Sequence, residues 1–244
     1  MEVIWDGIVQ AARLLFGGDP ATWEIIGLSL RVSGVSLAVA MVVGIPLGYL
    51  LGSKRFVGKR LLMIVVNTGM GLPPVVAGLI VYLFLSRSGP IADLWTGATA
   101  QESPRMLFTV GAMMIAQFVI SSPLVVGVTA AAIASVPVEL RLQARSLGAS
   151  AFQEAALTVK EARRGVMAAI VAGFGGIISE VGAVMLVGGN IEGSTRVMTT
   201  AIVLETRKGN FGLALALGLI LIGISFAINN GLTALQQSGG RYER

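Results

Sequence analysis

Residues 140–165 have the sequence LRLQARSLGASAFQEAALTVKEARRG and lie between two strongly apolar runs of the chain. Neighbouring helices usually need only a few residues to connect them. A polar segment of this length, in which apolar residues recur at helical spacing, predicts a docking surface for another protein. The chain would then be one part of a larger assembly whose energy source lies in a different subunit.

The composition places the flanking runs in a membrane. Hydrophobic residues make up 55% of the 244 residues and charged residues only 13%, and the mean hydropathy is +0.82. A soluble domain carries about a quarter charged residues. Because backbone groups in lipid must be satisfied within the chain, we expect an all-α polytopic membrane protein.

The residue types that are missing also narrow the function. The chain has no cysteine and no histidine, which excludes thiol chemistry, histidine acid–base catalysis and the usual transition-metal ligands. In a membrane protein, the excess of basic residues behind a net charge of +5 indicates which loops face the cytoplasm rather than binding to nucleic acid. We therefore expect no nucleic-acid partner, no bound metal and no catalytic residues.

Five apolar segments are long enough to cross a bilayer, which takes roughly 20 residues each. Residues 1–20 predict an amphipathic interfacial helix, because Glu2 and Asp6 stand where a signal peptide would be basic. The five predicted spans are 25–51, 61–85, 106–133, 166–187 and 211–235.

The distribution of Lys and Arg orients these spans. Three regions are basic: residues 54–60, the polar segment 140–165 and the C-terminal tail with Arg241 and Arg244. Two predicted spans separate each of these regions from the next, so all three can face the same side of the membrane. We expect all three on the cytoplasmic side of a bacterial inner membrane, with the acidic N-terminus outside. The loop 190–210 carries cations on the predicted outer face, so a sixth crossing by the N-terminal helix is the alternative, which Arg13 and the short length of that helix disfavour.

The polar segment itself predicts two short helices with a turn at Gly148. Ser150 is the expected N-cap of the second helix, with Gln153 completing a capping box. An apolar face formed by Phe152, Ala155, Ala156 and Val159 suits either a groove on a partner protein or the surface of the inner leaflet. The pattern alone leaves both interpretations open.

A family resemblance favours the interpretation that this apolar face docks in a groove of a partner protein. Residues 143–150, QARSLGAS, resemble the EAA loop of ABC-importer permeases, EAAxxxG followed by IxLP. Ala144 and Gly148 match the motif, whereas Leu142 replaces its acidic residue and Glu161 its proline. In that family the loop forms a coupling helix that sits in a cleft of the cytoplasmic ATP-binding subunit.

Other segments resemble one group within this family, the molybdate and tungstate permeases. Residues 71–78, GLPPVVAG, resemble its LPPVVxG element, and residues 178–191, ISEVGAVMLVGGNI, resemble its GExGAxxMxxGNI segment. Residues 193–209, GSTRVMTTAIVLETRKG, and the Ala-Leu-Thr-Val…Glu-Ala-Arg pattern of 156–163 are most similar to the tungstate permeases.

The resemblance implies a type I ABC-importer permease fold: one transmembrane domain over residues 1–244, with a cytoplasmic coupling loop at 140–165. No GxxxxGK[ST] motif occurs, so ATP and Mg²⁺ would be bound by the partner and no cofactor by this chain. The ATPase-coupling residues would be Ala144, Arg145, Gly148, Ala149, Ser150, Glu154, Ala155 and Glu161.

The expected function is transport of an oxyanion, tungstate first, with molybdate, sulfate or phosphate as alternatives. The expected partners are a second copy of the chain, two ATP-binding subunits and a substrate-binding protein. A secondary transporter would need coordinating carboxylates at mid-membrane and internal repeats, and a membrane enzyme would need convergent acid–base or metal ligands. One deep acid, Glu180, and no evident repeat argue against the secondary transporter, and the absence of histidine and cysteine argues against the enzyme.

Polar residues in or beside spans are the candidates for the translocation path. A tetrahedral oxyanion offers only hydrogen-bond acceptors, so its path needs hydroxyls, amides and a cation. Glu180 could instead be a structural acid bonded to a neighbouring helix, and the cluster around Arg196 a solvated loop. The candidates are Asn67, Ser121, Ser122, Glu180, Thr195, Arg196, Thr199 and Thr200.

Overall fold

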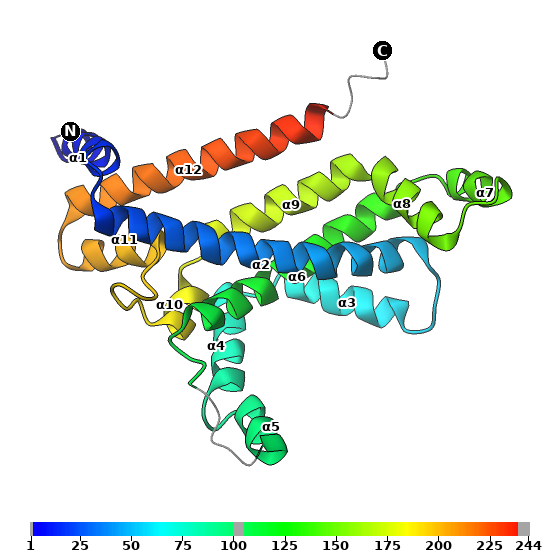
Figure 1. Cartoon of the computed structure of the whole chain (residues 1–244), viewed down its shortest axis with the longest axis horizontal. Helices are drawn as coiled ribbons and strands as arrows, with labels where there is room; N and C mark the ends of the chain where they lie inside the picture. Colours follow the sequence, from blue (N-terminus) through cyan, green and yellow to red (C-terminus); the bar gives the residue numbers. More distant parts are fainter. Residues whose placement is uncertain (1, 100–104, 239–244) are drawn as a thin grey trace. The chain divides into compact units, whose positions relative to one another are not determined.

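The computed structural model describes residues 2–99 and 105–238, which form helices and no strand (Figure 1). The expected all-α class is confirmed, and the tail residues Arg241 and Arg244 lie outside the described part. The helices are α1 Glu2–Phe16, α2 Pro20–Ser53, α3 Lys59–Met70, α4 Pro74–Leu85, α5 Pro90–Thr99, α6 Val110–Ala134, α7 Val138–Ser146, α8 Ala151–Glu161, α9 Arg163–Ile178, α10 Gly182–Gly188, α11 Met198–Arg207 and α12 Phe211–Ser238.

Three of the five predicted spans are single long helices, namely α2, α6 and α12. Within the described residues, four helices are long and apolar enough to cross a membrane, and a fifth span results if the bent pair α9 and α10 counts as one. The four are Pro20–Ser53, Pro74–Gly97, Val110–Ala134 and Phe211–Gln236.

The predicted span 61–85 is wrong as one continuous helix. Helix α3 ends at Met70, and α4 begins at Pro74 with Pro73 as its N-cap. Two successive prolines supply no amide hydrogens, and each disfavours helical backbone in the residue before it. Twelve residues of α3 rise only about 18 Å. The candidate span here is instead Pro74–Gly97, which includes α4 and most of α5.

The predicted span 166–187 is also interrupted, between α9 and α10. The break frees backbone groups, and three side chains bind them. Gln117 Nε2 donates to the carbonyl oxygen of Ile177 at 3.1 Å, and Thr199 Oγ1 donates to that of Glu180 at 2.9 Å. The Glu180 carboxylate accepts the amide of Ala183 at 3.0 Å, so Glu180 lies at the break of this bent pair and its side chain binds the first turn of α10.

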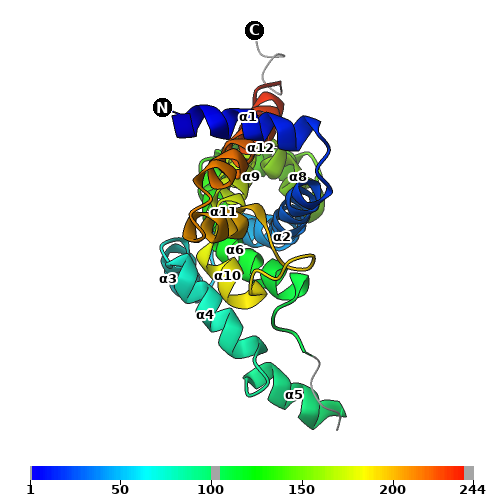
Figure 2. The ribbon, with the colours of Figure 1, turned by 90° about the vertical axis from the view of Figure 1, so that its left-hand side faces the viewer.

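The chain divides into two compact units, each described by itself. The first contains Met1–Ser36, Pro73–Val119 and Ile177–Ala227, and the second contains Leu37–Leu72, Ile120–Gly176 and Ile228–Arg244. In the first unit, α1 lies across the beginning of α12, and α4 lies beside α10 (Figure 2). One apolar cluster of this unit joins Ala11, Ile26, Met198, Ala216 and Ile220.

In the second unit, α2 packs against α6 through glycines four residues apart. A Cβ on Gly48 would lie 2.9 Å from the carbonyl oxygen of Val126, and one on Gly52 would lie 2.6 Å from that of Ala130. Small residues at this spacing let two helix backbones approach closely, and the resulting van der Waals packing is one of the forces that associate helices in lipid. Leu51 completes the contact with Val126 and Ala130.

We predict that Gly48→Ala destabilises the protein whereas Gly34→Ala on the same helix does not. The new methyl at position 48 would meet Thr129 Cβ at 2.7 Å, while position 34 has no atom within 4 Å. Overpacking of this kind costs about 1–3 kcal/mol. Thermal unfolding of the two purified variants in the same detergent measures the difference, and equal midpoints would contradict the close approach of α2 and α6.

Candidate functional site

The polar segment forms the helix pair α7 and α8, joined by a turn at Gly148. Gly148 has a left-handed φ of +85°. The amide of Ala149 bonds the carbonyl oxygen of Ala144 at 3.0 Å, and the amide of Gly148 bonds that of Arg145 at 2.9 Å. This pair of bonds is the Schellman arrangement, in which a glycine ends a helix by satisfying its last carbonyls. The predicted glycine turn is confirmed.

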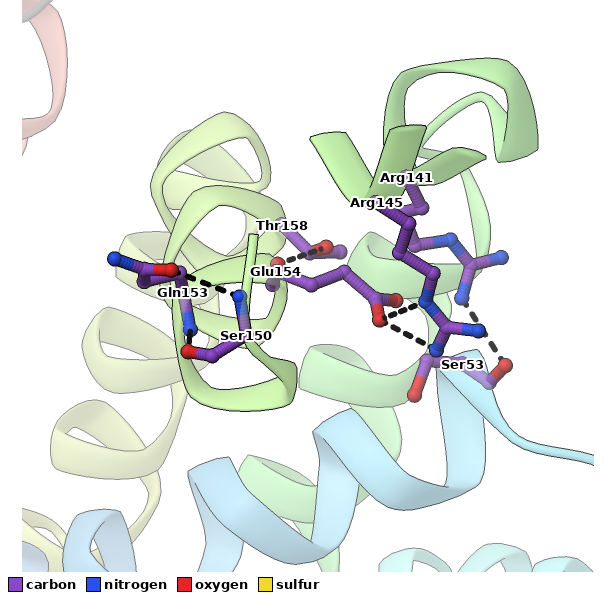
Figure 3. Close-up of polar contacts among 7 residues, drawn as sticks. All are labelled: Ser53, Arg141, Arg145, Ser150, Gln153, Glu154 and Thr158. Carbon is purple, nitrogen blue, oxygen red and sulfur yellow. Dashed lines mark hydrogen bonds and ion pairs between the residues drawn. The ribbon is translucent and has the colours of Figure 1, made fainter. Parts of the chain in front are cut away.

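The predicted capping box at the start of α8 is confirmed as well. Ser150 Oγ accepts the amide of Gln153 at 3.3 Å, and Gln153 Oε1 accepts the amide of Ser150 at 2.8 Å (Figure 3). Both bonds occupy amides that a helix start leaves without partners. Helices α7 and α8 therefore have sharply defined facing ends.

An ion pair bridges the two helices. Arg145 of α7 contacts Glu154 Oε2 through Nε at 2.6 Å and Nη2 at 2.5 Å. The Glu154 side chain is only 3% exposed, whereas that of Arg145 is 54% exposed. Figure 3 shows the guanidinium reaching from α7 across to the carboxylate on α8. A buried carboxylate needs such a partner, so the pair holds α7 against α8.

Two further residues of this site were not predicted from the sequence. Arg141 Nη1 donates to the carbonyl oxygen of Ser53 at 3.0 Å, which ties α7 to the end of α2 (Figure 3). Thr158 is fully buried, and its hydroxyl donates to the carbonyl oxygen of Glu154 at 2.7 Å. Their spacing gave a signal, because Arg141 precedes Arg145 and Thr158 follows Glu154 by four residues, so each pair shares a helix face.

The apolar face of α8 forms one wall of a groove of about 630 Å³. The other wall is a stretch of α2, and Phe152 is strongly exposed at its edge. Glu161 ends α8 and is exposed. The groove is lined by Ile45, Pro46, Tyr49, Leu50, Phe152, Ala155, Ala156, Val159 and Lys160.

The candidates for the translocation path fall in different places. Asn67 is exposed on α3, while Ser121 is buried and Ser122 half-buried on α6, all three in the second unit. Glu180 and Thr199 meet at the break before α10, in the first unit. Gln117, which is buried and also binds that break, was missed, although a glutamine inside an apolar span is itself a signal.

The threonines near Arg196 are buried rather than in a solvated loop. Thr195 Oγ1 donates to the carbonyl oxygen of Gly188 at 2.5 Å and accepts the amide of Ile191 at 3.0 Å. Thr200 Oγ1 bonds the backbone of Val197. These hydroxyls are thus occupied by local backbone groups.

Four charged side chains of this region, those of Glu192, Arg196, Glu205 and Lys208, form ion pairs. Arg196 forms an ion pair with Glu192 at 3.0 Å. Glu205 on α11 accepts Asn210 Nδ2 at 2.7 Å and Lys208 Nζ at 2.8 Å. The hydrogen bond from Asn210, followed by that from Lys208, holds the pKa of Glu205 below its usual 4.5 against the opposing effect of burial.

The sequence is similar to those of known transport proteins. Residues 44–238 match the sequence family described as "Binding-protein-dependent transport system inner membrane component". The chain is 40% identical over 237 residues to the "Tungstate uptake system permease protein TupB" of Peptoclostridium acidaminophilum, covering 97% of this chain and 100% of that protein. It is 41% identical over 211 residues to a "Probable anion ABC transporter permease protein" of Haloferax volcanii, covering 84% and 87%.

A solved structure shares the fold. A chain of the bacterial alginate ABC transporter, crystallised "in complex with alginate pentasaccharide-bound periplasmic protein", aligns with a TM-score of 0.75. The alignment covers 88% of this chain and 78% of that one at 19% identity. At this level of identity the likeness supports the arrangement of helices and nothing about the cargo.

We predict that Arg145→Gln loosens α7 and α8, because Glu154 would remain buried without a cation. An unsatisfied buried polar group costs about 1–3 kcal/mol. Amide hydrogen exchange should accelerate in residues 138–161, and the double variant R145Q/E154Q should recover part of the protection, since neither charge is then unpaired. Arg163→Gln removes the same charge from the exposed start of α9 and serves as control; equal exchange in R145Q and R163Q would contradict the bracing role.

We predict that Glu205 makes the protein less stable in acid. A carboxylate with a lowered pKa contributes stability above its unfolded-state value, here 4.5, and that contribution is lost as the pH falls through the folded-state pKa. Glu205→Gln should lower the thermal midpoint at pH 7, and the gap to the wild type should shrink toward pH 3. Parallel midpoint curves for the two proteins would contradict this assignment.

Proposed function

The chain belongs to the family of binding-protein-dependent transport system inner membrane components, and from this premise we propose that it carries an oxyanion, tungstate first, across the membrane as the permease of an ATP-driven importer. The observation that carries the choice of ion is the 40% identity to a tungstate uptake permease over 97% of the chain. Molybdate is the next candidate, because a molybdenum transport permease of Escherichia coli is also related, at 32% identity. Sulfate and phosphate are the remaining candidates for the transported ion.

Helices α7 and α8 are the proposed coupling element to the ATPase. Their ends are fixed by the Gly148 turn and the Ser150 capping box, and the Arg145–Glu154 pair braces them. A load applied to these helices is transmitted to α2 through the Arg141 bond to Ser53. Such a rigid, polar surface suits a cleft on a cytoplasmic subunit. The coupling residues are Ala144, Arg145, Gly148, Ala149, Ser150, Glu154, Ala155 and Glu161.

The assembly that follows has several subunits. ATP and Mg²⁺ would be bound by two cytoplasmic ATP-binding subunits, since the 244 residues contain no GxxxxGK[ST] motif. A second copy of the chain would complete the pore, because a twofold pair is the usual way to enclose a path at an interface. A substrate-binding protein would deliver the ion to the outer face, and residues 1–244 would form one transmembrane domain.

The proposed topology places the N-terminus outside and the C-terminus in the cytoplasm. Basic residues at 54–60 and in α7–α9 then lie on the cytoplasmic side. Helix α1 would lie in the outer interface, since it is amphipathic and its Ala11 packs on the cluster with α12.

The ion would meet neutral donors and a cation along its path. Arg196 is proposed as the attracting cation, and Asn67, Ser121 and Ser122 as neutral polar contacts. Thr195, Thr199, Thr200 and Glu180 would instead maintain the backbone at the gate, since their side chains bind backbone groups. Closure of the ATP-binding subunits would push on the paired coupling helices and rock the spans between inward and outward openings.

We predict that Gly148→Val uncouples transport while Gly148→Asn largely preserves it. No atom lies within 4 Å of a Cβ at this position, so a substitution meets no steric clash and its cost comes from the left-handed backbone alone. That backbone costs a β-branched residue about 1–2 kcal/mol, whereas Asn tolerates it. In proteoliposomes holding the permease, its ATPase and its binding protein, ATP-driven tungstate uptake should fall at least about fivefold in G148V.

Two controls decide between the proposal and its rivals. Uptake by the permease alone, without ATPase subunits, would show a secondary transporter instead. Excess sulfate that suppresses tungstate uptake as strongly as unlabelled tungstate would refute the choice of ion. Equal uptake by G148V and the wild type would refute the role of the turn.

A further inference from the structure

A second pocket lies on the polar side of the coupling helices, and we name it the basic pocket. It has a volume of about 270 Å³, or roughly nine water volumes at ~30 Å³ each. It joins the end of α2 to α7 and to one residue of α8. Its lining consists of Ser53, Lys54, Arg55, Val138, Arg141, Leu142, Arg145 and Glu154.

The pocket has an excess of positive charge. Four of its residues are cations, Lys54, Arg55, Arg141 and Arg145, and one is an acid, Glu154. Glu154 is already paired with Arg145, so it neutralises at most one of the four positive charges. A concave site lined by one sign of charge concentrates ions of the opposite sign.

Two residues that line the pocket each have a buried polar atom without a partner among the described residues. Ser53 Oγ and Arg141 Nε are both buried, and neither has a hydrogen-bond partner there. Arg141 uses Nη1 to bind the Ser53 carbonyl, which leaves Nε as a spare donor. Most buried polar atoms in folded proteins are paired. Ser53 and Arg141 therefore each retain a spare donor beside the four cations, which favours a ligand that offers acceptors.

The end of α2 offsets this preference only in part. A helix C-terminus carries partial negative charge on its last carbonyls, which disfavours an anion. The Ser53 carbonyl, however, already accepts the hydrogen bond from Arg141. The guanidinium therefore shields that carbonyl from the pocket.

We propose that the basic pocket binds a phosphate-type oxyanion group, either a free tetrahedral anion or the headgroup of an anionic phospholipid. Such a group has only acceptor oxygens, and arginine is suited to bind it through several N–H groups at once. Arg145 would be shared between this anion and Glu154, since it is 54% exposed while paired. Occupancy thus bears directly on the ion pair that braces α7 against α8.

The test titrates inorganic phosphate into the purified full-length permease in a non-ionic detergent, at constant ionic strength set with chloride. Calorimetry should detect binding by the wild type and about tenfold weaker binding by K54Q/R55Q, because two of the four cations that line the pocket are removed. The double variant leaves the Arg145–Glu154 pair and the Arg141 bond untouched. Arg141→Gln is the second variant and should also weaken binding.

The matched control is Arg163→Gln, which removes a cation from the neighbouring α9 but not from the pocket lining. It should bind phosphate like the wild type. Equal affinity in K54Q/R55Q, R141Q and the wild type would overturn the proposal, as would equal losses in R163Q and K54Q/R55Q. No ATPase is present, so a negative result leaves the proposed transport function unaffected.

A second arm distinguishes the two sources of the anion. The thermal midpoint is compared in nanodiscs of phosphatidylcholine and in nanodiscs containing phosphatidylglycerol. Stabilisation by phosphatidylglycerol that disappears in K54Q/R55Q would identify a lipid headgroup, and phosphate binding in phosphatidylcholine discs would identify a free anion. The absence of both effects would overturn the proposal.

Discussion

A backbone group freed inside a membrane must find a partner within the protein, because lipid offers none. The break between α9 and α10 shows how this chain meets that requirement. Gln117 and Thr199 satisfy the carbonyls of Ile177 and Glu180, and the Glu180 carboxylate satisfies the amide of Ala183. The helix is thus interrupted without leaving these three groups unpaired. Glu180 and Thr199, both candidates for the translocation path, thus bind backbone groups at this break.

The helix pair outside the apolar spans follows a different rule. There, water can solvate an open helix end, so the sharp turn between α7 and α8 reflects a need for a defined shape. The Schellman bonds at Gly148 and the capping box at Ser150 set the two helix ends. Glu154 is buried, and its burial is tolerable only because Arg145 reaches it. The shape of this helix pair therefore depends on the Arg145–Glu154 ion pair as well as on the two helix ends.

The sequence predicts what depends on local chemistry. The glycine turn, the Ser150 cap and the three unbroken spans follow from residues within a few positions of each other, and all are found. The break at 71–73 has a local signal in Pro73 and Pro74, but the predicted span was drawn from hydropathy, which averages over a window and passes across it. The break at 179–181 contains no proline and was missed for the same reason. The burial of Thr195 depends on Gly188, seven residues away and beyond a helix end. The bond between Arg141 and Ser53 joins residues 88 positions apart, which a single sequence does not reveal.

Helix α8 contributes to two different surfaces at once. Glu154 and Thr158 point into the protein, while Phe152 and Ala155 face the groove beside α2. A helix held by polar bonds on one side and by apolar contact on the other resists rotation, because turning it would expose one set and bury the other. It moves most readily as a unit with α7. Under the proposed function, this is the property a coupling element needs, since a push on α8 is transmitted through Arg145 to α7 and through Arg141 to the end of α2.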